Sequence, residues 1–254
     1  MLNTIRHDGP DNIVPLVIAH GLFGSARNWG VIAKRLSKER PVIAVDMRNH
    51  GHSPRADSQS YIDMADDLAE VIASLGTADL LGHSMGGKAA MAMALTRPKG
   101  LRRLIIADIA PVSYPHSQNH NIDAMDSVDL NAVTRRSEAD AMLGEAGVEP
   151  ALRSFFTQSL DIQSRSWRLN LPVLRAEMEK IVGFPDIDAV HEGPTLFLTG
   201  AESDYVTRED RDGIKALFPN AVFAKIPGAG HWLHADKPRE FTAAVAAYLA
   251  AGDV

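Results

Sequence analysis

The residues best placed to do chemistry begin with the pentapeptide GHSMG, which spans Gly82 to Gly86. It follows a short apolar run and precedes a stretch of small residues, as a G-x-S-x-G turn between a strand and a helix does. Glycines at both flanks permit a strained turn in which a side chain would collide with neighbouring backbone. We therefore predict that Ser84 is an exposed nucleophile at a helix amino terminus, which favours developing negative charge, and not an idle serine in a glycine-rich turn.

A serine hydroxyl needs a general base, and with a turn of this kind the histidine comes late in the chain, after the acid. The segment IPGAGHWLHADKP places His231 in a glycine-rich loop directly after the last apolar run. His234 is a second candidate, one helical turn later, where it is expected to help begin the final helix. We predict that His231 is the base that activates Ser84.

Two aspartates compete to orient this histidine. Asp108 ends the segment LIIADIAP, so its carboxylate is expected at the edge of the core, where it needs a partner such as the Nδ1–H of His231. Asp204 lies in the loop after Gly200, which is the more usual place for the acid and is commonly written G-x-x-D-x-x-V. However, Ser203 occupies the usual register of the acid, and the segment around Asp204 looks solvated. The sequence favours Asp108 and leaves Asp204 as the alternate acid.

A second backbone feature should hold the oxyanion that forms during acyl transfer. The segment HGLFGS (20–25) directly follows the first strong apolar run, so its N–H groups can face the site. In this arrangement one donor is the amide after the nucleophile, which is Met85, and the other comes from the loop. We assign the loop amide to Leu22, with Phe23 as the alternate.

Short apolar runs that alternate with amphipathic segments indicate βαβ units and a mostly parallel sheet. The runs are too short for buried helices, and we predict strands over residues 14–20, 41–46, 78–84, 101–108, 194–200 and 221–227. We predict helices, the first with Ser60 and Asp63 as a capping box, over residues 60–76, 85–98 and 243–251.

The alternation stops between Pro111 and His191. Three segments there are predicted to be helices, residues 130–147, 149–161 and 165–183, and none is a convincing strand. A helical block inserted before the last two strands would lie beyond the carboxyl edge of the sheet, where ligands bind in open α/β folds. No flexible linker flanks it, so an independent second domain is disfavoured. We predict an α/β core formed by residues 1–110 and 192–254, with a helical cap at 111–191.

The aromatic residues of the cap, Phe155, Phe156 and Trp167, allow two interpretations. They either line a substrate pocket or form the cap's own core, and the sequence does not distinguish the two. The candidate pocket residues are Phe23, His83, Phe155, Phe156, Trp167 and Trp232.

Together with DMRNHGHSP (46–54), these motifs resemble those of α/β-hydrolases, in particular the small YbfF-type bacterial esterases and their mitochondrial abhydrolase-domain relatives. The shared motifs are HGLFGS, D-x-R-N-H-G-x-S, GHSMGGK-x-A-M and GAGHW-x-H-A. The resemblance runs from about residue 14 to the carboxyl terminus and is weakest in the cap. It implies an α/β-hydrolase fold and hydrolysis of ester or thioester bonds, with Ser84 as nucleophile, His231 as base and Asp108 as the acid. Dehalogenases and epoxide hydrolases of the same fold instead have aspartate in place of the serine.

The composition excludes several other classes. With 26 Lys and Arg against 32 Asp and Glu, the net charge is −6, which argues against nucleic acid and anionic membranes as partners. The absence of cysteine removes disulfides, thiolate ligands and a cysteine nucleophile. The chain starts with no signal-like segment, and no apolar run approaches the roughly 20 residues that span a bilayer. A cytoplasmic protein is expected.

Metal and cofactor chemistry is not expected either. His50 with His52, and His116 with His120, lack an obvious set of carboxylate partners. Asp46 and Arg48 are expected to hold their own turn together.

The sequence therefore predicts a serine hydrolase of small-molecule carboxylic esters that needs no metal or cofactor. An acyl-CoA or other thioesterase is the alternative, because the same site cleaves both bonds. A ligand-binding module that keeps the fold without turnover is the alternative of a different class, and the sequence leaves the oligomeric state open.

Overall fold

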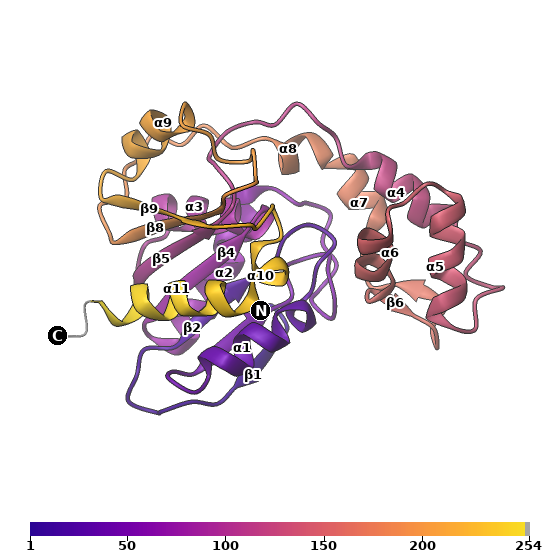
Figure 1. Cartoon of the computed structure of the whole chain (residues 1–254), viewed down its shortest axis with the longest axis horizontal. Coiled ribbons are helices and arrows are strands. Elements are labelled where there is room, and N and C mark those ends of the chain that lie inside the picture. Colours follow the sequence, from indigo (N-terminus) through magenta and orange to yellow (C-terminus); the bar gives the residue numbers. More distant parts are fainter. Residues whose placement is uncertain (252–254) are drawn as a thin grey trace.

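A seven-stranded sheet in the order β1-β3-β2-β4-β5-β8-β9 forms the centre of a computed structural model that describes residues 1–251 (Figure 1). Its neighbouring strands are parallel, except that β1 pairs antiparallel with β3. The strands are β1 (Thr4–His7), β2 (Leu16–Ala19), β3 (Val42–Val45), β4 (Ala78–His83), β5 (Leu101–Ala107), β8 (Thr195–Gly200) and β9 (Ala221–Ile226). The six predicted strands all form, and the mostly parallel α/β fold is confirmed.

Helices cover both faces of this sheet, because the inner strands are buried on both sides. Along β2, Leu16 and Ile18 pack with the helices of one face, while Val17 and Ala19 pack with those of the other. Helices α1 and α11 cover the first face, and α2, α3 and α9 the second. Their bounds, with those of the short η1 and α10, are η1 (Ala26–Trp29), α1 (Gly30–Leu36), α2 (Tyr61–Leu75), α3 (Met85–Thr96), α9 (Asp210–Leu217), α10 (Leu233–Asp236) and α11 (Pro238–Ala250).

Helices form over all three predicted ranges, although the last one begins already at Pro238. The predicted capping box of α2 is only half formed, because the Ser60 N–H donates to Ser58 Oγ and not to Asp63. Helix α2 begins after Ser60, whose hydroxyl accepts a hydrogen bond from the Asp63 N–H at 3.2 Å, as an N-cap does. Gly76, at φ +80°, follows its last residue. In α3 nearly every residue is buried, since its small side chains let the helix pack closely between the sheet and α2.

Residues 111–191, which we call the cap segment, leave the core after β5 and return before β8, and in Figure 1 they extend to one side of the sheet. Their elements are α4 (Asn119–Asp126), α5 (Arg136–Glu145), α6 (Pro150–Thr157), β6 (Leu160–Asp161), β7 (Ser166–Trp167), α7 (Leu171–Ala176) and α8 (Met178–Val182). The insertion of a helical block before the last two strands is as predicted. The domain boundaries themselves stay a prediction, and residues 252–254 of the predicted core lie outside the described part of the chain.

The expectation that the cap segment holds no strand is wrong, because β6 and β7 pair as a small antiparallel hairpin. Two-residue strands are too short to show an alternating pattern in the sequence. The segment that begins at Arg165 is likewise not one helix, since it passes from β7 into the separate helices α7 and α8.

Candidate active site

Ser84 lies in the sharp turn between β4 and α3. Its φ of +52° is unusual for a residue with a side chain, so the backbone here is strained. A Cβ on Gly82 would lie 2.2 Å from the Gly86 carbonyl oxygen, and a Cβ on Gly86 would lie 2.4 Å from that of Ala19. The two glycines are therefore required by close backbone approach, which is the reason that the motif suggested.

The Ser84 hydroxyl is the first group in a chain of three. Its Oγ lies 3.1 Å from His231 Nε2, and His231 Nδ1 lies 2.8 Å from Asp108 Oδ2. Because an ionised carboxylate only accepts hydrogen bonds, Nδ1–H donates to Asp108. Nε2 is then free to accept the hydroxyl proton of Ser84.

Asp108 is fully buried and has a φ of +53°, directly after the end of β5. Besides His231, its carboxylate accepts a hydrogen bond from the Gly200 N–H at 2.9 Å and another from the Ser203 hydroxyl. Three donors thus compensate its burial. Asp204, by contrast, has an exposed side chain.

Besides Asp108, two contacts hold His231 in place, one at its backbone and one at its ring. Its backbone carbonyl accepts a hydrogen bond from His83 Nε2 at 2.9 Å. Burial lowers the pKa of His83 well below its usual value, so this side chain is a neutral donor. The ring of Tyr205 stacks on the imidazole at 3.7 Å between centroids, with 16° between the planes. The π-face of Tyr205 therefore lies against the ring that becomes cationic when it takes a proton.

His234, the competing histidine, has a different environment. It lies in the short helix α10 and stacks on Trp29 at 4.2 Å between ring centroids. Burial lowers its pKa to about 3. It is therefore a neutral aromatic part of the wall around the site.

The loop 20–25 lies directly against the nucleophile. A Cβ on Gly21 would come within 3.1 Å of Ser84 Cβ, so a larger residue here would require neighbouring side chains to move. The Phe23 N–H donates to His50 Nε2 at 3.2 Å and is thus already engaged. This contact favours Leu22 over Phe23 as the second oxyanion donor beside Met85, although that role remains a prediction.

Two buried histidines fix this loop, and the sequence did not single them out for that task. His20 Nδ1–H donates to the Gly21 carbonyl at 2.7 Å, and its Nε2 accepts the Met47 N–H at 2.9 Å. The Nδ1–H of His50 donates to the Arg48 carbonyl at 2.8 Å. Burial lowers the pKa of both histidines, that of His50 to about 3. Both rings are therefore neutral links between the loop 20–25 and the turn 46–54.

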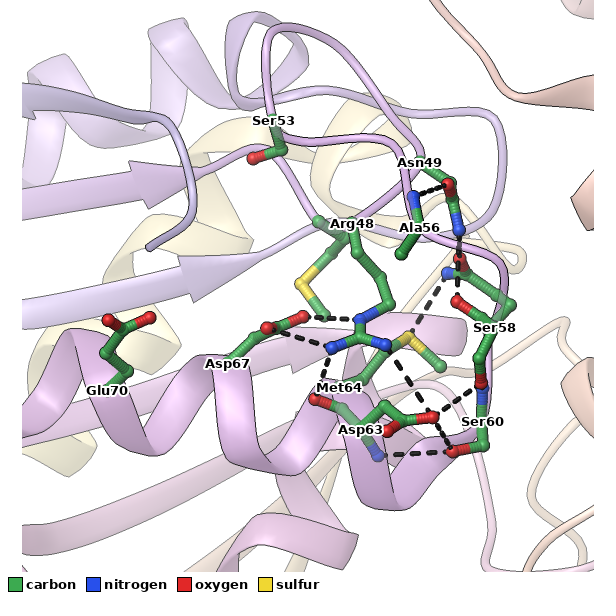
Figure 2. Close-up of polar contacts among 12 residues, drawn as sticks. Arg48, Asn49, Ser53, Ala56, Ser58, Ser60, Asp63, Met64, Asp67 and Glu70 are labelled. Carbon is green, nitrogen blue, oxygen red and sulfur yellow. Dashed lines mark hydrogen bonds and ion pairs between the residues drawn. The ribbon is translucent and has the colours of Figure 1, made fainter.

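The turn 46–54 is itself tied to the rest of the core. Asp46 accepts hydrogen bonds from the N–H groups of His52 and Ala26, so it holds both its own turn and the start of η1. Arg48 was expected to hold the same turn, but its side chain binds α2. Figure 2 shows its guanidinium between Asp63 and Asp67, and its Nε lies 2.6 Å from Asp67. Helix α2 therefore anchors the turn that carries His50.

A cavity of about 140 Å³ opens between the carboxyl edge of the sheet and the cap segment, with Ser84 and His231 in its wall. Among the predicted pocket residues, those that line it are Phe23, His83, Phe155, Phe156 and Trp232. Trp167 lies elsewhere, and its predicted place in the pocket is wrong. Its side chain is buried within the cap segment, where the indole N–H donates to the Met125 carbonyl at 3.1 Å. A buried indole needs such an acceptor, and the cap interior provides it.

Three further residues lie at this site that were not predicted from the sequence to be functional. In the sequence Ser203 only interrupts the acid motif, and nothing in the sequence singled out Tyr205. Lys88 lines the cavity one helical turn after Ser84. A single lysine within a helix that is otherwise mostly Ala, Met and Gly was a signal that could have identified it.

None of the helices in residues 1–251 combines the length and apolar character that crossing a membrane requires.

Comparisons with known proteins bear on this geometry. Residues 16–245 match the alpha/beta hydrolase family. The chain is 41% identical to an sn-1-specific diacylglycerol lipase, ABHD11, of Danio rerio over 95% of this chain and 80% of that protein. It is 39% identical to the esterase YbfF of Escherichia coli over 94% of both chains. A solved structure of a marine microorganism esterase superposes with a TM-score of 0.90 at 37% identity and covers 98% of this chain and all of that one.

Proposed function

The chain belongs to the alpha/beta hydrolase family and is a hydrolase, and on that premise we propose that it cleaves carboxylic esters through an acyl-enzyme on Ser84. The observation that carries the proposal is the unbroken chain of contacts from Ser84 Oγ through His231 to Asp108. This arrangement is the one that makes a serine hydroxyl nucleophilic at neutral pH.

The reaction has two steps. His231 Nε2 takes the proton of Ser84 as Oγ attacks the ester carbonyl, and the resulting imidazolium then protonates the leaving alcohol. In the second step the same nitrogen activates a water molecule, which releases the acid and frees Ser84. Asp108 keeps the Nδ1–H tautomer and stabilises the imidazolium in both steps.

The tetrahedral oxyanion in each step is held by the backbone N–H groups of Leu22 and Met85. Two observations support this assignment, namely the approach of Gly21 to Ser84 and the start of α3 at Met85. A preorganised donor of this kind contributes on the order of 3 kcal/mol of transition-state stabilisation.

The substrate is expected to be a neutral ester with apolar groups, since aromatic and aliphatic side chains predominate in the cavity wall. The relatives agree with this expectation, because one is named an esterase and another a lipase of diacylglycerol, itself a carboxylic ester. A thioester would fit the same catalytic groups, so ester and thioester must be compared directly.

The decisive experiment is covalent labelling with a fluorophosphonate probe. The wild-type protein should be labelled, and Ser84→Ala should lose both labelling and ester hydrolysis. Asp204→Asn is the control, because this exposed carboxylate lies outside the chain of contacts. If the wild-type protein refuses the probe and hydrolyses no ester, the proposal is wrong and the fold is used for binding.

A panel of p-nitrophenyl esters and acyl-CoAs of graded length then determines the bond and the chain length. A kcat/KM at least tenfold higher for esters than for thioesters of equal acyl length would establish the ester assignment. The reverse ranking would assign thioesterase activity to the same site.

A further inference from the structure

Lys88 is a lysine buried in the wall of the cavity, and no step of the proposed reaction uses it. It lies on α3, four residues after Ser84, and only 1% of its surface is exposed. Burial of an ammonium group costs free energy unless hydrogen bonds compensate it. The partners of this lysine therefore indicate what it does.

Those partners are three backbone carbonyl oxygens and not carboxylates. Nζ donates to the carbonyl of Val112 at 2.7 Å, to that of Val182 at 2.8 Å and to that of Gly183 at 2.6 Å. Val112 lies where the chain enters the cap segment, whereas Val182 and Gly183 lie at the end of α8, where it returns. One ammonium group thus joins the segment that enters the cap to the end of α8.

The bonds at this ammonium are of the strong, charge-assisted kind. Nζ also lies 4.6 Å from the centroid of the Tyr114 ring, within cation–π distance. Burial lowers the pKa of Lys88 to about 7, while the three carbonyl oxygens favour the charged form. An apolar side chain of the same length would leave all three carbonyls without this donor.

Two more contacts close the same junction. The Tyr61 hydroxyl, on α2, donates to the Ile181 carbonyl at 2.5 Å. The Tyr114 N–H donates to the Val182 carbonyl at 3.0 Å. Ile181 and Val182 line the cavity, so the groups that join the two segments also hold this part of its wall.

We propose that Lys88 is a specificity-determining residue, which fixes the Ile181–Val182 wall of the cavity and thereby limits the length of the substrate chain. The ammonium acts by tying Val112 to residues 182–183. The proposal rests on the ester hydrolysis proposed above, and it predicts a change in selectivity and not in the chemistry at Ser84. Turnover of a short ester by the wild-type protein checks the proposed function separately.

The test compares Lys88→Met with the wild-type protein on two series of esters, p-nitrophenyl esters of increasing acyl length and acetates of increasing alcohol length. Loss of the ammonium should let the wall move outward. The kcat/KM ratio of the eight-carbon to the two-carbon substrate should rise about tenfold in at least one series, mainly through KM. Lys215→Met is the matched control, because Lys215 also donates to two backbone carbonyls, those of Pro219 and Ala221, but away from the cavity. Its ratio should stay at the wild-type value.

Circular dichroism shows whether Lys88→Met is folded. Should it fail to fold, Tyr61→Phe tests the same wall, because it removes only the hydroxyl that donates to Ile181. It should raise the same ratio by about threefold, in keeping with one lost hydrogen bond. The proposal is overturned if a folded Lys88→Met keeps the wild-type kcat/KM ratio in both series. If Lys88→Met does not fold, the same result for Tyr61→Phe overturns it. The lysine would then serve stability alone.

Discussion

The catalytic edge of the sheet and the cap segment are attached to the core in different ways. Ser84, Asp108 and His231 follow the ends of β4, β5 and β9 closely, and Asp108 alone accepts three hydrogen bonds. The cap segment shares an apolar cluster with the core, and polar side chains such as Lys88 and Asn170 also bind across the junction. Chemistry is therefore set by strand ends, whereas cavity shape depends on contacts between the core and the cap segment. Mutations should separate the two.

The largest effect is expected from Asp108→Asn. Its amide would no longer hold the Nδ1–H tautomer of His231, and kcat should fall by about four orders of magnitude. Steady-state hydrolysis of p-nitrophenyl acetate measures this loss. Asp204→Asn should retain wild-type kcat, because the Asp204 side chain is exposed. The opposite pattern would move the acid to position 204 and weaken the contrast between a rigid sheet edge and an adjustable cap.

An intermediate effect is expected on the free energy of unfolding at acidic pH. It acts through His50, which contacts both the loop 20–25 and the cap segment. Its ring accepts the Phe23 N–H of the loop 20–25, and its backbone forms a bridge with Leu169 of the cap segment. The folded-state pKa of His50 is about 3, below its unfolded value, so the unfolded chain binds a proton that the folded chain does not. The contribution of His50 to the free energy of unfolding is thus fully present above about pH 6.5. It is lost as the pH falls towards 3, at about 1.4 kcal/mol per pH unit.

Urea unfolding between pH 6.5 and 4 measures that slope. His50→Asn should lower it by about 1.4 kcal/mol per pH unit, since one such proton is removed. His120→Asn, at an exposed position of the cap segment, is the control and should keep the wild-type slope. Equal slopes in His50→Asn and wild type would show that His50 does not couple protons to folding.

The smallest effect is expected from Asn170→Ala in the cap segment. The Asn170 amide donates to Asn49 Oδ1 at 2.9 Å, so its loss should lower the free energy of unfolding by about 1 kcal/mol. Hydrolysis of the acetyl ester should stay within twofold of wild type, because Ser84 and its partners are attached elsewhere. Thermal unfolding measures the loss of stability, and steady-state kinetics measure ester hydrolysis. Asn131→Ala, an exposed asparagine of the same segment, should change neither. A drop in kcat of tenfold or more in Asn170→Ala would contradict the separation of cap and chemistry.

The elements of the core could be predicted from the sequence because each has a strong local signal. The inner strands are short, continuous apolar runs, and α2 has a serine cap at one end and glycine at the other. The edge strand β1 was missed, since its residues alternate between exposed and partly buried and it is only four residues long. Helix α4, with the polar sequence NHNIDAMD, has no comparable apolar stripe and was missed for that reason.

The candidate site divides in the same way. The G-x-S-x-G turn and the late glycine-rich loop directed attention to Ser84 and His231, and the apolar neighbours of Asp108 suggested that its carboxylate needs a partner. The contact between Ser203 and Asp108 could not be predicted, because it depends on how two loops from neighbouring strands meet in space. The place of Trp167 was equally open, since burial in the cap and burial in the pocket leave the same apolar signature.

The hydroxyl of Ser203 has a consequence for how such a site can change in evolution. It contacts the same carboxylate oxygen, Asp108 Oδ2, that receives the Nδ1–H of His231. A carboxylate at position 203 would thus stand beside the same edge of the imidazole. An ancestor with acids at both positions could lose either one while the nucleophile and the base kept their places. The ends of two neighbouring strands therefore offer the acid two positions beside one imidazole edge.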